Sequence, residues 1–76
     1  MEPRESIAYP GRWSVVEDGL ILCDGIDHDE AVARAWTRYT GDREEQMREA
    51  IVRLLELDMA PRLVQAACRR VLGRLS

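Results

Sequence analysis

The segment from Cys23 to Glu30 gathers most of the residue types in this chain that bind metals or transfer protons. It reads CDGIDHDE, with one thiol, the only imidazole of the chain and four carboxylates in eight positions. A structural zinc site needs four Cys, His or carboxylate ligands, and no second cluster of Cys or His completes that set. A calcium loop of the EF-hand type needs acids at fixed alternate positions, Gly at the sixth and Glu at the twelfth, and the segment does not fit. We therefore predict no metal site and no cofactor.

Catalysis by the same segment would require Cys23 and His28 to act as nucleophile and base, which their separation in sequence does not forbid. No third residue is marked out to orient the imidazole, and the chain has no G-x-S-x-G, no phosphate-binding Gly loop and no HExxH. A chain this short also has little room for a deep pocket. We expect no enzyme and no catalytic residue.

A simpler interpretation of this segment is a turn followed by the start of a helix. Asp27 suits the N-cap, and Glu30 three residues later completes a capping box. Asp29 adds a negative charge where the helix dipole is positive.

Basic residues are the second group that could do chemistry, and all eleven are Arg. Arg without Lys is typical of a GC-rich bacterium or its mobile DNA. Residues 1–58 carry fourteen acids and seven Arg, or −7, whereas residues 59–76 carry four Arg and no acid, or +4. Such a split indicates either a partner-facing patch or a last helix that complements its own dipole.

The Arg residues of the last helix are the candidate partner-binding site. At about 100° per residue, they lie opposite the apolar stripe of that helix or at its edge. Such a surface would bind an acidic protein or a phosphate, or it would simply be solvated, and both interpretations stay open. The candidates are Arg62, Arg69, Arg70 and Arg74.

Three helices are predicted to position these groups, at about residues 28–40, 42–57 and 59–75. The helix at 42–57 has the most regular apolar stripe, so we expect it to be the central one. Gly41 is expected to end the first helix in a left-handed conformation, and Asp42 to cap the second through a capping box with Glu45. The stripe consists of Met47, Ala50, Ile51, Leu54 and Leu55.

A β-hairpin is predicted at about residues 12–24, because Asp18-Gly19 lies between two runs of β-prone residues. A two-residue type I′ turn would pair Glu17 with Leu20. A three-residue loop with a bulge would shift the register by one residue. The alternation of Ile7 and Tyr9 with polar or small neighbours leaves open a third short edge strand there, after a frayed start.

Length and composition favour one small domain spanning residues 1–76. The apolar fraction is 46% and the charged fraction 33%, which is typical of a globular protein. No apolar run could span a bilayer and no signal segment opens the chain, so we expect a cytoplasmic protein that does not bind membranes. We also expect Cys23 and Cys68 to be free thiols. The predicted fold class is α+β, with an N-terminal antiparallel hairpin packed on three α-helices.

The function expected from these features is that of a small non-enzymatic interaction module with a macromolecular protein or nucleoprotein partner. Small acidic proteins with Arg-only basicity include phage and mobile-element inhibitors of bacterial host systems, anti-CRISPR proteins among them; the analogy rests on size and composition. The alternative is a helix-turn-helix-like regulator that binds DNA through its third helix. A self-assembling structural subunit, such as a homodimer, is the second alternative.

Overall fold

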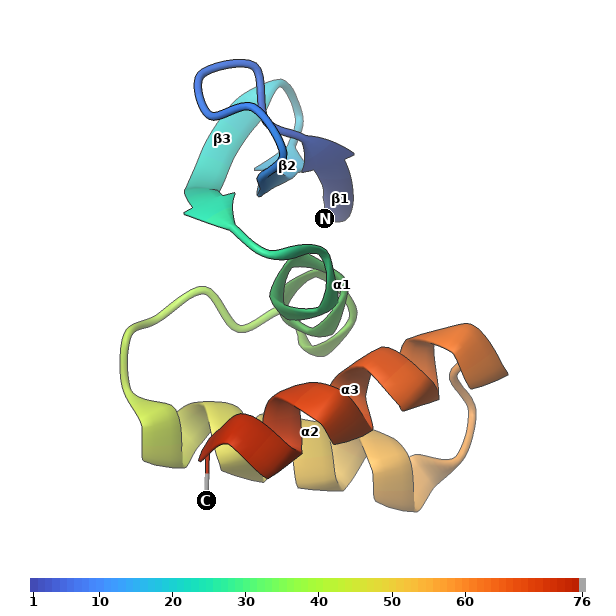
Figure 1. Ribbon diagram of the computed structural model, residues 1–76. Helices are drawn as coiled ribbons and strands as arrows, with labels where there is room; N and C mark the ends of the chain where they lie inside the picture. Colours follow the sequence, from blue (N-terminus) through green and yellow to red (C-terminus); the bar gives the residue numbers. More distant parts are fainter. Residues whose placement is uncertain (76) are drawn as a thin grey trace.

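The computed structural model describes residues 1–75 and places three antiparallel strands ahead of three helices (Figure 1). The predicted α+β fold, with its N-terminal hairpin packed on helices, is confirmed. None of the helices in the described part of the chain has the length and apolar character needed to cross a membrane. The elements are β1 (Glu2–Glu5), β2 (Trp13–Glu17), β3 (Leu20–Ile26), α1 (His28–Thr37), α2 (Glu44–Leu57) and α3 (Arg62–Leu75).

The hairpin turn between β2 and β3 has the two-residue form that the Asp-Gly pair predicts. Asp18 and Gly19 both have positive φ, at 51° and 79°, as a type I′ turn requires. Glu17 consequently pairs with Leu20.

A bulge changes the register beyond this turn. Val15 pairs with Cys23, whereas regular pairing would set it opposite Leu22. The extra residue lies in β3, so Val15 and Cys23 both come to the face of the sheet that packs on α1.

The third strand exists, but the prediction of its position and of a frayed start was wrong. β1 pairs with β2 in the sheet order β1-β2-β3, and residues 6–12 form the connecting loop. The Ser6 N–H donates to the Arg12 carbonyl at 2.9 Å and closes this loop, while Ile7 within it is 96% exposed. The alternation of Ile7 and Tyr9 therefore reflects a loop rather than a strand.

Helix α1 lies in the middle of the molecule, between the sheet and the other two helices (Figure 1). Ala31 and Ala35 pack with Val15 beneath the sheet, while Val32 and Ala33 pack on the helical side. Two buried faces on one helix require small residues, because large side chains would hold its neighbours apart. The prediction that the helix at 42–57 is central was wrong, since α2 contacts α1 and α3 but no strand.

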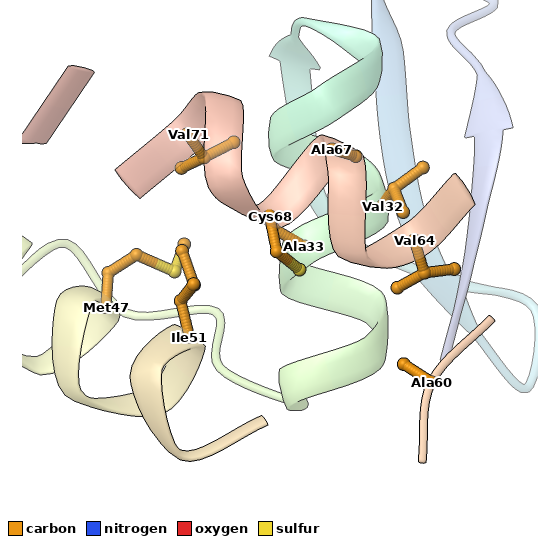
Figure 2. Close-up of a cluster of buried hydrophobic side chains, with 9 residues drawn as sticks. All are labelled: Val32, Ala33, Met47, Ile51, Ala60, Val64, Ala67, Cys68 and Val71. Carbon is orange, nitrogen blue, oxygen red and sulfur yellow. The ribbon is translucent and has the colours of Figure 1, made fainter. Parts of the chain in front are cut away.

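The larger core cluster joins all three helices (Figure 2). Ile51 of α2 and Cys68 of α3 are fully buried at its centre. Burial raises the pKa of the Cys68 thiol, so it stays protonated and packs as a small apolar side chain. Both cysteines are free. The cluster consists of Val32, Ala33, Met47, Ile51, Ala60, Val64, Ala67, Cys68 and Val71.

The first helix ends earlier than predicted, at Thr37 rather than near residue 40. Arg38, with φ of 61°, takes the left-handed C-cap conformation that the sequence assigns to Gly41. The chain then needs residues 39–43 to turn into α2, which begins at Glu44 rather than at residue 42.

The prediction that Asp42 caps α2 was wrong, and Tyr39 bonds the start of this helix instead. Its hydroxyl accepts a hydrogen bond from the Arg43 N–H at 3.1 Å and donates to Oε1 of Gln46 at 3.0 Å, while Arg43, at the N-cap, makes no side-chain cap bond. A Cβ atom on Gly41 would lie 2.5 Å from the same hydroxyl oxygen. Gly41 is thus required for space beside Tyr39 rather than for a left-handed conformation.

The third helix begins at Arg62, three residues later than predicted. Asp58 ends α2 in a left-handed conformation with φ of 52°. The buried Gln65 side chain donates to Oδ1 of Asp58 at 3.0 Å and to the Ala60 carbonyl at 2.9 Å. These two bonds hold the α2–α3 turn in place.

Replacing Gly41 by Ala should lower the free energy of unfolding by about 1–3 kcal/mol, because the methyl group displaces the Tyr39 ring. Gly73→Ala is the matched control: it lies in α3 with open space around the added Cβ and should raise stability by up to about 1 kcal/mol. Urea unfolding measures both changes. Equal stability of the two variants would contradict the close approach of Tyr39 to Gly41.

Candidate partner-binding surface

The start of α1 is fixed by Asp27, as predicted. Its Oδ1 atom accepts a hydrogen bond from the Glu30 N–H at 2.8 Å. The return bond of a capping box is missing, because the Glu30 carboxylate accepts instead from Nε of Arg34 at 3.0 Å.

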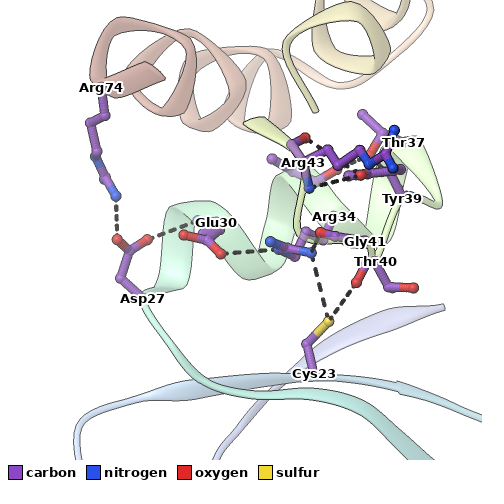
Figure 3. A network of polar contacts seen from close by, with 11 residues as sticks. Cys23, Asp27, Glu30, Arg34, Thr37, Tyr39, Thr40, Gly41, Arg43 and Arg74 are labelled. Carbon is purple, nitrogen blue, oxygen red and sulfur yellow. Dashed lines mark hydrogen bonds and ion pairs between the residues drawn. The ribbon is translucent and has the colours of Figure 1, made fainter. Parts of the chain in front are cut away.

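Two of the four candidate Arg residues bind the acidic start of α1. Arg70 donates through Nε and Nη2 to the two oxygens of Asp29, at 2.7 and 3.0 Å. Arg74 donates to Asp29 at 3.3 Å and also pairs with Asp27 (Figure 3). These ion pairs join the last turns of α3 to the first turn of α1.

The pKa of Asp29 is lowered from 3.8 to about 2, chiefly because Arg70 hydrogen-bonds its carboxylate. Asp29 is the better shielded partner, with a side chain 16% exposed, against 58% for Arg70. The pair therefore has a structural role within the chain.

Arg62 and Arg69 differ from Arg70 and Arg74 in having no carboxylate partner within residues 1–75. Arg69 donates to the Gln65 side-chain oxygen at 3.4 Å, and both Arg side chains are exposed. Two of the four candidates thus keep a charge that the described residues do not neutralise.

Cys23 and His28 do not meet as a nucleophile and its base. The Cys23 sulfur is 3.8 Å from the Thr40 carbonyl oxygen, whereas the His28 ring makes an edge contact with Trp13 at a centroid distance of 4.8 Å. Nδ1 of His28 is 3.3 Å from Asp29. In the described part of the chain, no three His, Cys, Asp or Glu side chains are grouped so as to hold a metal ion.

Arg34 connects α1 to β3 and to the α1–α2 loop (Figure 3). Besides Glu30, its guanidinium contacts the Gly41 carbonyl at 2.8 Å and the Cys23 sulfur at 3.9 Å. Its side chain is 14% exposed, although helical periodicity places it on the solvent face. Arg34 thus has a structural role that its position in the helical repeat does not reveal.

Large apolar side chains are exposed around the α2–α3 turn. Leu57, Met59 and Leu63 are 62%, 84% and 85% exposed, and Arg62 lies among them in sequence. We call these four residues the turn surface. The sequence does carry a signal for this surface, because its apolar residues lie off the helical stripes that form the core.

A second apolar surface lies between the end of α1 and the second half of α2. It is a cavity of about 220 Å³, which we call the α1–α2 groove. Trp36 is 45% exposed and lines this groove. The lining residues are Trp36, Thr37, Arg38, Ala50, Arg53, Leu54 and Leu57.

No family model, curated protein or solved structure matches this chain.

Replacing Arg70 by Ala should lower the melting temperature and raise the pKa of Asp29 from about 2 toward 3.8, because the bidentate bond is lost. The neighbouring Arg69→Ala should change neither quantity, since Arg69 has no carboxylate partner within residues 1–75. NMR titration of the Asp29 side chain measures the pKa directly. Identical Asp29 titrations in the two variants would show that the pair does not form in solution.

Acid should weaken the fold through Asp29. Its folded pKa, about 2, lies below its ordinary value of 3.8, so its stabilising effect is complete above about pH 4 and is lost as the pH falls toward 2. Asp29→Asn should remove this part of the pH dependence. Urea unfolding between pH 2 and 6 makes the comparison; an unchanged acid slope in the variant would refute the assignment.

Proposed function

We propose that this chain is a non-enzymatic interaction module that binds a macromolecular partner, a protein or a nucleoprotein, through the turn surface. The observation that carries the proposal is the exposure of Leu57, Met59 and Leu63 within seven residues of chain. Large apolar side chains exposed so close together in the chain of a small protein are typical of interaction sites. Met and Arg are also enriched at protein–protein interfaces.

The unneutralised charges in the first half of α3 and at its middle support this proposal. Arg62 belongs to the turn surface, and Arg69 follows two helical turns later on α3. Arg binds carboxylates and phosphates through two parallel hydrogen bonds, so these residues would add specificity to an apolar contact. Arg70 and Arg74 would contribute less, because binding a partner would require them to leave Asp29 and Asp27.

DNA binding by the third helix has less support. Helices α2 and α3 lie side by side and run in opposite directions (Figure 1), whereas the helices of a helix-turn-helix cross at about 90–120°. Asp27 and Asp29 would also lie beside any phosphate bound by Arg70 or Arg74. The net charge of −3 further disfavours nucleic acid.

The biological role we propose is inhibition of a bacterial host system by a phage or mobile element. Support comes from small size, an acidic balance and Arg-only basicity, features shared with anti-CRISPR proteins as a type. Expression in a bacterium with a defined CRISPR system should restore plating of a targeted phage. Unchanged plating across representative CRISPR types would refute this role but not partner binding.

A charge placed on the turn surface should abolish partner capture. Leu63→Glu and Met59→Glu each put a carboxylate where an apolar contact is proposed, and both sites are exposed, so the fold should be kept. Ile7→Glu is the matched control, because Ile7 is equally exposed but lies in the β1–β2 loop at the other end of the molecule (Figure 1). Affinity capture from a GC-rich bacterial lysate, followed by mass spectrometry, compares the three variants.

The same capture experiment separates the candidate partners. Capture of a protein partner should persist after nuclease treatment and in moderate salt. Binding to DNA should weaken steeply with salt and be competed by duplex DNA, and recovery of the chain itself would indicate self-assembly. Equal capture by all three variants would refute a role for the turn surface.

A further inference from the structure

We propose that the α1–α2 groove binds an acidic peptide segment of the partner through one large apolar side chain of that segment. The inference rests on the proposed function, since it assigns a second contact to the same partner. Leu57 belongs to both surfaces, so the groove continues the turn surface toward the end of α1.

The size of the groove fits one anchoring side chain. Its volume of about 220 Å³ is below the roughly 300–1,000 Å³ of pockets that hold small-molecule ligands or cofactors. Trp36 forms part of its wall and remains 45% exposed. Exposed Trp at the centre of an apolar surface is a common hot spot of protein recognition.

The charge around the groove selects an acidic peptide. Two of its lining residues are Arg and none is acidic, in a chain with fourteen acids. Arg38 is paired with Glu17 at 3.0 Å. The side chain of Arg53 is exposed and makes no hydrogen bond or ion pair within residues 1–75. Arg53 is therefore the cation available to a carboxylate of the peptide.

The arrangement therefore predicts how the peptide binds. Its apolar side chain enters between Trp36 and Leu54, and a carboxylate next to it in sequence pairs with Arg53. A basic peptide would meet Arg53 with like charge and be rejected, because unfavourable charge pairs at an interface act against wrong partners.

The test begins with a phage-displayed library of random peptides selected on the immobilised chain. The selected peptides should share a large apolar residue flanked by Asp or Glu. In an NMR titration, such a peptide should shift the indole N–H signal of Trp36 and leave that of Trp13 unmoved. Trp13 is an internal control because it lies beside His28, outside the groove.

Charge reversal at the rim provides the second measurement. Arg53→Glu should weaken binding of the selected peptide at least about tenfold, and should favour a version whose acids are replaced by Lys. Arg12→Glu is the matched control, since Arg12 is also exposed and has no side-chain partner in the described residues. Its affinity for the peptide should be unchanged, and the melting temperatures of both variants should confirm folding.

Three outcomes of the peptide experiments would overturn the inference. These are a selection that yields no acidic consensus, a selected peptide that leaves the Trp36 signal unmoved, and equal loss of affinity in the Arg53 and Arg12 variants. A Trp36 signal that moves with protein concentration alone would instead indicate a second copy in the groove. Capture that fails for Leu63→Glu but is unaffected by Arg53→Glu would refute the groove and leave the turn surface in place.

Discussion

The rest of the structure depends on the burial of α1 between two layers. The sheet packs on Ala31 and Ala35, and the other helices pack on Val32 and Ala33. The strands make no contact with α2 or α3. The sheet and the α2–α3 pair therefore each bury their apolar face against this one helix. Residues as small as Ala allow both layers to approach closely. Arg34 lies between Ala33 and Ala35 in sequence, and its partly buried charge is compensated by contacts with Glu30, the Gly41 carbonyl and the Cys23 sulfur.

Half of the basic charge of the last helix is used within the molecule. The acidic start of α1 and the basic end of α3 are more than forty residues apart, yet Arg70 and Arg74 bind Asp29 and Asp27. The two carboxylates lie at the positive end of the α1 dipole and Arg74 lies at the negative end of the α3 dipole, so these charges also suit their own helices, and the ion pairs anchor the last turns of α3. A cluster of basic residues in a sequence is consequently weak support for a binding surface until the acids near it in space are known.

The two surfaces proposed for binding lie on the helical side of the molecule and share Leu57. Their chemistry is complementary: the turn surface offers exposed aliphatic side chains with Arg62, and the groove offers Trp36 with Arg53. Helices α2 and α3 bury their apolar stripes against α1 and against each other. The apolar residues of the two binding surfaces that stay exposed lie outside these stripes. Keeping them exposed has a cost in solubility, which a partner that covers them would offset.

The sequence by itself determined the features that depend on neighbours a few residues away. The type I′ turn at Asp18-Gly19, the N-cap of Asp27 and the existence of three helices all follow from local chemistry, and so does the α+β class. Tertiary structure decided what depends on distant residues: the place of β1, the bulge that sets Cys23 opposite Val15, and the cap that Tyr39 provides for α2. It also decided which Arg residues are neutralised and which apolar residues stay exposed. The physical reason is that periodicity orients a side chain on its own element but does not say which other element, if any, will cover it.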